Sequence, residues 1–523
     1  MSGTEQQGRF ATEPFIEGTP EQYARLREWL VAMEYTEPTL CAKADVRTIA
    51  HLNSLGERRT VFTDPADKQS LLVLLFLDGD AIPWTTLRAV LSPDEESIIT
   101  ALGLLVPAVE SPECCVAPVA VIPVEGLYVV SDRLRGLEVI DGSTPSDIVY
   151  SPITPETARF VGLMPRFACE NYLEMCGGTG IAALIAARDF ARHAWSADIT
   201  ERSTRFARFS AALNGLENFT AVQGDLYAPV GGHTFDLITA HPPYVPAEET
   251  EMVFRDGGAD GEQITRRIVA EVEPYLRPGG QLYVDCVMTD RAGDPLEHRV
   301  RRMLGPSEGE FDVVVIRGGV VDPRIYRAER LQTGQMTPQA FLHQTELFKR
   351  LRVEQFVATT VLIQRRTSER PVVTRHRVLT PETRAYHLQW VLDYLARTVE
   401  WGSDDADRIL SYRLRTSPRA ELRVRSMLRD GEWSPVETRI AAMVPFAVEA
   451  PCPPILSTLL ARCDGRLTGR EHLDALRASG DVPPEKTDAD FAQLIRELAD
   501  AAYIELDAFP IGEVIAKKSA SVA

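Results

Sequence analysis

The sequence contains a glycine-rich turn of the kind that lets a backbone approach a ligand closely. Residues Glu174-Met175-Cys176-Gly177-Gly178-Thr179-Gly180 stand between an apolar run and an alanine-rich segment, the pattern of a strand, a turn and a helix. Glycines remove side-chain bulk, and the helix that follows presents free N–H groups. We expect a nucleotide-like ligand here. A P-loop is excluded because no Gly-Lys-Ser/Thr follows, whereas the turn alone leaves dinucleotide binding open.

Two acidic residues follow at the ends of the next two predicted strands. Asp198 ends the run AWSADIT, where a carboxylate can bond the hydroxyls of a ribose. Asp225 lies in VQGDLY and is placed to accept from the exocyclic amine of an adenine. Either acid alone is more often a surface or capping residue. The glycine-rich turn, Asp198 and Asp225 follow one another at the ends of three successive predicted strands, and this combination favours a nucleoside ligand.

A proline-stiffened corner follows the fourth predicted strand. Phe235–Ala240 leads into His241-Pro242-Pro243-Tyr244. Consecutive prolines fix the backbone and leave carbonyls without a neighbouring N–H, so these carbonyls can accept from a substrate. Tyr244 can stack on a flat group while His241 and the Pro242 carbonyl accept its N–H bonds. In isolation the motif is more often a tight turn with a core tyrosine, but its place after a complete ligand set favours a clamp for a planar nitrogen.

The elements around these residues predict an α/β fold. Short apolar runs alternate with helical segments from about residue 148, which is typical of a doubly wound, Rossmann-like sheet. We expect seven strands, at 171–176, 194–199, 219–223, 235–240, 280–287, 311–316 and 356–364. The long connection 317–349 is expected to help cover the acceptor pocket, with Tyr326 and His343 as candidate lining residues.

Three domains are expected: 1–147, 148–368 with the insertion 317–349, and 369–523. In the first, helices at 21–34 and 68–77 precede two short apolar runs around 116–130. In the last, the strands are expected to stop after Arg366. Helices are expected there at 381–400, 455–464, 468–478 and 488–502, followed by the apolar run Ala502–Leu506. Both terminal domains are predicted to be mixed helical, winged-helix-like modules, and a homodimer through them is possible on this pattern.

Composition narrows the class of partner. The formal net charge of −19 disfavours a nucleic-acid partner, which needs a positive surface. The arginines of 413–429, interrupted by Glu421, are expected to form a solvated helix face. Eight scattered cysteines form neither a disulfide framework nor a paired zinc site, so we expect no metal and a reducing compartment. The N-terminus lacks a signal-peptide pattern and the apolar run Leu71–Leu77 is too short to span a bilayer, so a cytoplasmic protein without membrane contact is expected.

Taken together, these motifs resemble the class I S-adenosylmethionine-dependent N-methyltransferases with an (Asn/Asp/Ser)-Pro-Pro-Tyr motif, and within them the HemK-type protein-glutamine methyltransferases. The resemblance covers roughly residues 148–290. Besides the motifs above, it includes three stretches: Thr154-Pro155-Glu156-Thr157, Asp256-Gly257-Gly258-Ala259-Asp260-Gly261, and Leu276-Arg277-Pro278-Gly279-Gly280.

The resemblance implies S-adenosylmethionine as cofactor and assigns roles to the matching residues. Glu174, Gly178 and Gly180, with Cys176 in the same turn, would hold the methionine and ribose portion. Asp198 with Ile199 would bind the ribose, and Asp225 with Leu226 the adenine. His241, Pro242, Pro243 and Tyr244 would hold the acceptor, with His241, Pro242 and Tyr244 as the catalytic set and His241 also facing the cofactor.

Two positions depart from the family pattern. Cys176 stands where the first glycine is usual. His241 replaces the asparagine that reads a carboxamide as donor and acceptor, whereas a neutral imidazole offers one of each from different nitrogens. An unperturbed imidazole would lose this neutral form, and activity with it, below roughly pH 6.

Four hypotheses of function follow. The first is N-methylation of a planar or amino nitrogen of a small molecule, amino acid or peptide by in-line transfer from the cofactor. The second is N5-methylation of a glutamine in a release factor or ribosomal protein, as the resemblance implies. The third is O-methylation with His241 as general base. The fourth, from a different class, is a scaffold protein that binds the cofactor without catalysis.

Overall fold

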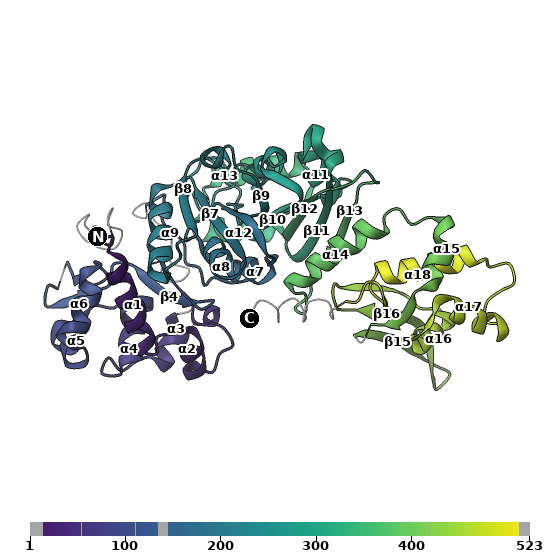
Figure 1. Ribbon diagram of the computed structural model, residues 1–523, viewed down its shortest axis with the longest axis horizontal. Helices are drawn as coiled ribbons and strands as arrows, with labels where there is room; N and C mark the ends of the chain where they lie inside the picture. The colour runs from purple at the N-terminus through teal and green to yellow at the C-terminus, as the bar shows by residue number, and fades with distance from the viewer. Residues whose placement is uncertain (1–13, 54, 110, 134–144, 418, 512–523) are drawn as a thin grey trace. The chain divides into compact units, whose positions relative to one another are not determined.

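The computed structural model describes residues 14–53, 55–109, 111–133, 145–417 and 419–511 (Figure 1). The chain divides into two compact units. The first comprises Met1–Pro295, Met303–Gly305 and Val321–Phe356, and the second comprises Leu296–Arg302, Pro306–Val320 and Val357–Ala523. The predicted division into three domains stays a prediction, as does the homodimer.

The first unit begins with helices that bury leucine-rich faces. Thr19 caps α1 in a capping box with Gln22, and Leu26 and Leu30 are fully buried. Both predicted N-terminal helices are present, and a small antiparallel sheet of order β1-β3-β2 follows. The elements are α1 (Pro20–Ala32), α2 (Glu37–Ala44), η1 (Ile49–Asn53), α3 (Leu55–Val61), α4 (Lys68–Val73), η2 (Leu74–Asp78), β1 (Ile82–Pro83), α5 (Trp84–Val90), α6 (Pro93–Ala101), β2 (Val106–Pro107) and β3 (Cys114–Val116). The winged-helix description of this segment stays a prediction.

A buried hairpin joins this segment to the sheet that carries the site. Strands β4 (Ala120–Val124) and β5 (Leu127–Ser131) are buried along their whole length. The side chain of Asn214 in α9 bonds both the N–H and the carbonyl of Tyr128, and Arg202 in α9 makes two bonds with Asp132. Since both ions of that pair are buried, removal of either would leave an uncompensated charge in the core.

The central sheet contains all seven predicted strands. Its order is β13-β11-β12-β10-β9-β6-β7-β8, and the pairs β10·β9, β6·β9, β6·β7 and β7·β8 are parallel. The strands of the first unit are β6 (Cys169–Met175), β7 (Ala191–Asp198), β8 (Phe219–Gln223), β9 (Phe235–Ala240) and β10 (Leu276–Arg291); β11 (Phe311–Val321) and β12 (Val353–Arg365) span the boundary. The predicted number of seven is wrong by one, because β13 (Thr374–Val378) pairs in parallel with β11. Its sequence, TRHRV, has a single apolar residue, so no apolar run marks it as a strand.

Helices between the strands bury their apolar faces. The alanine-rich α8 (Ile181–Asp189) is buried from Ile181 to Ala187, and α9 (Glu201–Asn214) begins at the cap Thr200 and ends at Gly215 with a φ of 69°. The remaining connecting helices are α7 (Pro155–Leu163), η3 (Ala228–Val230), α10 (Gln263–Ala270), η4 (Glu273–Tyr275), α11 (Leu296–Met303) and η5 (Gly305–Glu310). The α/β doubly wound fold predicted from the sequence is therefore confirmed.

The long connection before β12 forms two helices, α12 (Pro323–Gln332) and α13 (Pro338–Arg350). From α13, Gln344 donates to the Pro246 carbonyl at 3.0 Å and His343 bonds Glu248. Pro246 and Glu248 follow directly after the corner His241–Tyr244, so α13 lies against the segment that continues from it. Tyr326 instead packs edge-on against Phe356 at 5.5 Å.

The second unit corrects the prediction that strands end at Arg366. The expected helices exist as α14 (Ala385–Thr398), α16 (Pro454–Arg462), α17 (Gly469–Ala478) and α18 (Asp488–Asp500), and the run near 502–506 forms β19 (Ile504–Leu506). The others are η6 (Ser403–Asp405), α15 (Ala406–Ser411), β14 (Arg413–Thr416), β15 (Ala420–Arg429), β16 (Glu432–Ala442), β17 (Val448–Pro451) and β18 (Asp464–Thr468). The strands β14 to β19 form two small sheets, of order β18-β14-β19 and β15-β16-β17, in which the paired strands are antiparallel.

Of the arginines of 413–429, Arg419 lies in a turn and the others lie on β14 and β15, so the expected helix face is wrong. In β15, charged and apolar residues alternate with period two, as in Glu421-Leu422-Arg423-Val424. Arg423 pairs with Glu421 and Glu449 on one face, and the exposed Leu422 and Val424 occupy the other. Glutamates therefore pair with part of this basic cluster, including Arg419 and Arg425.

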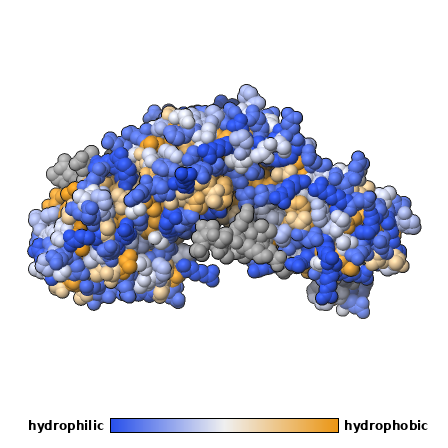
Figure 2. Space-filling model, in the orientation of Figure 1, coloured by the Kyte–Doolittle hydropathy of each residue, from blue (hydrophilic) through white to orange (hydrophobic). Residues whose placement is uncertain are grey.

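The visible face of the molecule is mostly hydrophilic, in keeping with a charged fraction of 25% (Figure 2). Among the described residues, no helix is both long enough and apolar enough to cross a bilayer.

Candidate functional site

The glycine turn and the proline corner leave the same edge of the sheet from neighbouring strands. In the parallel pair β6·β9, Met175 lies opposite Ala240, so the chain enters Cys176 and His241 side by side. Strands β7 and β8 end at this edge with Asp198 opposite Gln223. The parallel register thus brings the predicted cofactor residues and the predicted acceptor residues to one place.

Glu174 lies near the end of β6, and its buried carboxyl group faces the first turn of α8. It accepts from the backbone N–H groups of Ala182, at 3.3 Å, and Ala183, at 2.8 Å, and is 2% exposed. Burial raises the pKa of Glu174 to about 8, although these two hydrogen bonds favour the ionised form. A cation beside Glu174 would convert it to a carboxylate.

The glycine turn leaves room for a ligand at one position. Cys176, Gly178 and Gly180 all have positive φ, at 54°, 54° and 75°. A Cβ on Gly177 would lie 2.2 Å from the Ser196 hydroxyl, whereas a Cβ on Gly178 would meet no protein atom within 4 Å. Gly178 therefore borders open space, as a cofactor cradle requires. Cys176 tolerates a conformation that glycine adopts more readily.

Asp198 organises the turn as well as facing the ligand side. One carboxylate oxygen accepts from the Gly178 N–H at 2.9 Å, and the other accepts from the N–H and hydroxyl of Thr200. Next to it, Ile199 is 54% exposed, an apolar surface beside the predicted ribose site. The hydrogen bond between Asp198 and Gly178 thus fixes the acid and the glycine turn relative to each other.

Asp225 has a protein partner that the sequence did not predict. Both of its oxygens accept from Arg267 of α10, at 3.0 and 2.9 Å, and the side chain is 51% exposed. Each carboxylate oxygen has further lone pairs, so the pair leaves capacity for an amine donor. Leu226 is buried with a φ of 48° and turns the chain away from β8.

The proline corner is packed from two sides. The His241 ring lies 5.3 Å from Phe160 of α7 and 5.8 Å from Tyr244, centroid to centroid. The stretch after Asp256 packs against the corner so closely that a Cβ on Gly257 would lie 2.6 Å from the Pro243 carbonyl oxygen. Pro242 is buried, and Pro243 and Tyr244 are partly exposed. The corner is thus packed against the protein, while Pro243 and Tyr244 keep part of their surface exposed.

The two residues that sequence reasoning missed are Arg159 and Asp285. Arg159 of α7 donates from Nε to Asp285 Oδ2 at 3.0 Å, and the same oxygen is 3.9 Å from His241 Nδ1. Asp285 is fully buried in β10. An acid within the apolar run LYVDCV was the available signal, because a carboxylate at such a position needs a partner.

His241 is neutral at physiological pH. Burial lowers the pKa of its imidazole to about 4, and the Arg159 guanidinium acts in the same direction. The 3.9 Å between Nδ1 and the Asp285 carboxylate is too long for a hydrogen bond, and a neutral ring makes no ion pair. The backbone of Asp285 acts to raise the pKa of His241, but more weakly than burial lowers it. Nδ1 is buried without a hydrogen-bond partner among the described residues.

The fall of activity expected below pH 6 assumed an unperturbed imidazole; with the pKa of His241 lowered to about 4, we now expect that fall near pH 4. At saturating cofactor, kcat is expected to stay within about twofold between pH 8 and pH 5.

The stability of the fold depends on pH in a different way. Since the folded pKa lies below the unfolded value of about 6.5, the unfolded chain takes up the proton first, and His241 lowers the free energy of unfolding by up to about 3 kcal/mol between pH 6.5 and pH 4. Initial rates paired with circular dichroism at each pH would check both statements; a kcat midpoint near pH 6 in folded protein contradicts the first.

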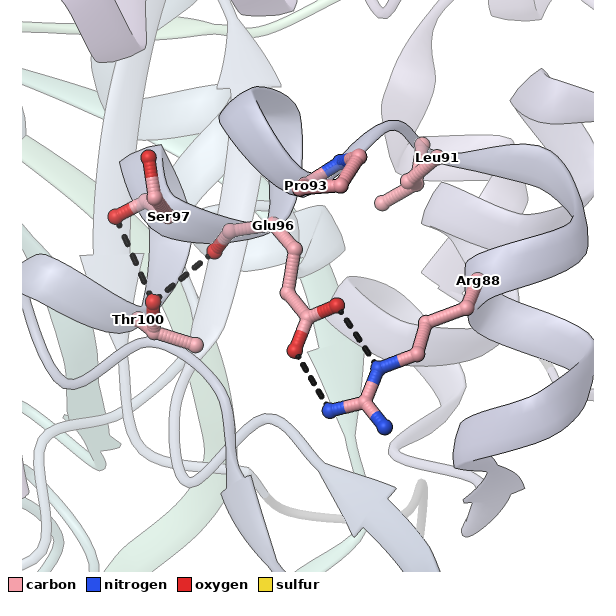
Figure 3. Close-up of a pocket in the computed structure, with 6 residues that line it drawn as sticks. All are labelled: Arg88, Leu91, Pro93, Glu96, Ser97 and Thr100. Carbon is pink, nitrogen blue, oxygen red and sulfur yellow. Dashed lines mark hydrogen bonds and ion pairs between the residues drawn. The ribbon is translucent and has the colours of Figure 1, made fainter.

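A hollow elsewhere in the first unit is not a competing site. It has a volume of about 420 Å³ and lies beside α5 and α6, lined by Arg88, Leu91, Pro93, Glu96, Ser97 and Thr100 (Figure 3). Arg88 makes two bonds of 3.0 Å to Glu96, so its charge is already matched. Among the described residues, no group of three or more His, Cys, Asp or Glu side chains is arranged to hold a metal ion.

Comparison with known proteins identifies the central segment. The family model described as methyltransferase small domain matches residues 155–304. This segment is a class I, HemK-like methyltransferase domain. It contains every predicted cofactor and acceptor residue.

The similar curated proteins have matching names. The ribosomal protein uL3 glutamine methyltransferase of Bradyrhizobium diazoefficiens is 37% identical over 128 residues, 22% of this chain and 40% of the relative. Its counterpart in Burkholderia pseudomallei is 36% identical over 135 residues, 22% of this chain and 44% of the relative. The release factor glutamine methyltransferase of Thermodesulfovibrio yellowstonii is 28% identical over 125 residues, 22% of this chain and 45% of the relative. The chain thus spans less than half the length of these relatives.

Proposed function

We propose that this protein is an S-adenosylmethionine-dependent N-methyltransferase that acts in the cytoplasm on a planar nitrogen. The observation that carries the proposal is the parallel register of β6 and β9, which starts the glycine turn and the proline corner side by side. A ligand in the turn and an acceptor at the corner would therefore face each other.

The residues of the turn fit the cofactor. The open space at Gly178, the exposed Ile199 and the acids at the ends of β6, β7 and β8 match the parts of an adenosine joined to an amino acid. Glu174, Cys176, Gly178 and Gly180 would hold the amino-acid and ribose end, Asp198 and Ile199 the ribose, and Asp225 and Leu226 the adenine. When bound, the cofactor supplies an electrophilic methyl group.

The corner residues would bind and orient the acceptor. The Pro242 carbonyl and the neutral His241 ring accept N–H bonds, and Tyr244 provides a flat surface for a planar group. These bonds aim the nitrogen lone pair, so alignment is the protein's main contribution to the rate. A group with a pKa of about 4 is a weak base toward a hydroxyl, which disfavours O-methylation with His241 as base.

The acceptor that we favour is a carboxamide of a protein or peptide. The relatives above bear names of glutamine methyltransferases, and a carboxamide is planar, as the corner requires. A nitrogen of a small molecule or free amino acid is the second candidate, favoured by the replacement of the family's asparagine by His241.

Two measurements test the proposal. Titration calorimetry with S-adenosylmethionine should show binding at micromolar to millimolar concentration, and its absence would exclude the enzyme. Incubation with methyl-labelled cofactor and a bacterial protein extract or a metabolite extract, followed by mass spectrometry, should place the label on nitrogen. Label on an oxygen, or binding without transfer, would instead support the O-methyltransferase or the scaffold.

Cofactor binding is expected to release a proton from Glu174. At pH 7 a carboxyl with a pKa of about 8 is mostly protonated, and the positive charges of the cofactor favour its ionised form. We expect about 0.5 to 0.9 proton released per cofactor at pH 7. Calorimetry in two buffers of different ionisation enthalpy measures this number, and Glu174→Gln, which cannot ionise, should abolish it. Heats that do not depend on the buffer in the wild-type protein would show that Glu174 is already ionised.

A further inference from the structure

We propose that Arg159 binds the carbonyl oxygen of the acceptor and supplies the donor that His241 lacks. This inference rests on the proposed N-methyltransferase function and extends it to a residue outside the matched motifs. It begins from one shared atom, Asp285 Oδ2, which lies 3.0 Å from Arg159 Nε and 3.9 Å from His241 Nδ1. The buried Asp285 thus anchors a guanidinium beside the acceptor corner.

His241 alone cannot read a carboxamide. That group needs an acceptor for its N–H and a donor for its carbonyl oxygen, and a single ring nitrogen performs only one of these roles. Because Nδ1 is buried, Nε2 is the nitrogen that a ligand can reach. With the Pro242 carbonyl, the corner then offers acceptors for the N–H bonds, and the donor must come from another residue.

Arg159 has the donor to give. Its Nε is used by Asp285, and its Nη2 is buried with no acceptor among the described residues. A buried donor without a partner is unfavourable, and an incoming carbonyl oxygen would satisfy it. The side chain is 26% exposed, so a ligand can reach the guanidinium, and a small turn about its Nε anchor would present the covered Nη2. Its charge acts on the corner itself, since together with burial it lowers the pKa of His241, and it opposes the larger effect of burial that raises the pKa of Tyr244.

The charges near the corner favour a neutral oxygen over a carboxylate. Asp285 already balances Arg159, and the exposed Glu156 on the same helix is close enough to raise the pKa of Tyr244. With His241 uncharged, an anionic acceptor would add a further negative charge to this set. The geometry therefore fits an amide carbonyl better than the carboxylate of an amino acid.

A double-mutant cycle tests the inference. The probe acceptor is N-acetyl-glutamine N-methylamide, which has one primary amide and no charge. In the His241 background, Arg159→Met should lower kcat/KM about 10- to 100-fold, the range of a hydrogen bond to a charged group, with a raised KM. In the His241→Asn background, where the asparagine supplies its own donor, the same change should cost less than about threefold.

Three outcomes decide the matter. Coupling between the two positions supports the inference. Equal losses in both backgrounds would show that Arg159 acts only through folding and would overturn it, while leaving the proposed function intact. No methyl transfer from the wild-type protein to any nitrogen would overturn both. If Arg159→Met fails to fold because Asp285 is left unpaired, Arg159→Lys, which keeps the ion pair but not the planar fork, replaces it in the same cycle.

Discussion

His241→Phe is expected to lower kcat/KM for methyl transfer about 100- to 1000-fold, the usual cost of removing one preorganised hydrogen-bonding group from an active site. The phenyl ring keeps the shape of the imidazole between Phe160 and Tyr244 but removes both nitrogens. Because the deleted Nδ1 is a buried atom without a partner, the free energy of unfolding should not fall. Loss of activity would then separate from loss of fold.

The measurement is steady-state kinetics with the acceptor found by mass spectrometry, together with calorimetry for the cofactor. Cofactor affinity should change by less than about threefold, since the proposed role of the His241 ring is to bind the acceptor; a larger loss would support the predicted contact of His241 with the cofactor. His193→Phe is a matched control, because His193 is a half-buried imidazole on β7 that bonds only Thr220. Activity that survives in His241→Phe would remove the ring nitrogens from the mechanism.

The sequence predicts the sheet well because its signals are local. Each of the seven strands contains a short apolar run, and each predicted functional residue lies at or just after the carboxyl end of one. Parallel strands end at one edge of the sheet. Glu174, Asp198, Asp225 and His241, which are far apart in the sequence, therefore come together at that edge. The spacing of apolar residues and the positions of the polar residues after them therefore suffice to predict which residues form the site.

What the sequence does not predict depends on contacts between distant segments. Arg159 and Asp285 are 126 positions apart, and only the packing of α7 on β10 joins them. The ion pair between Arg267 and Asp225 also joins two segments that are distant in the sequence. The pKa of His241 also follows from burial and from Arg159, which no local pattern encodes. The strands of 413–429 were mistaken for a helix because a dense run of arginines hides the period-two alternation beneath it.

Gly178→Ala is expected to weaken cofactor binding about 10- to 100-fold while leaving the protein folded. The added methyl group meets no protein atom, so it would fill the space that the cofactor needs, and crowding of this kind costs about 1–3 kcal/mol. The positive φ of 54° adds a strain of about 1 kcal/mol to the folded state. Thermal unfolding should therefore register a small change and calorimetry a large one.

Gly177→Ala provides the opposite result one residue earlier. Its methyl group would stand 2.2 Å from the hydroxyl of Ser196, a residue that is 3% exposed, so the cost falls on packing within the fold. We expect a loss of about 1–3 kcal/mol in the free energy of unfolding, and any protein that still folds should bind the cofactor more tightly than Gly178→Ala does. If the two variants lost cofactor affinity equally without any difference in stability, the open space beside Gly178 would not be the cofactor site. The alignment of methyl donor and acceptor nitrogen would then need another origin.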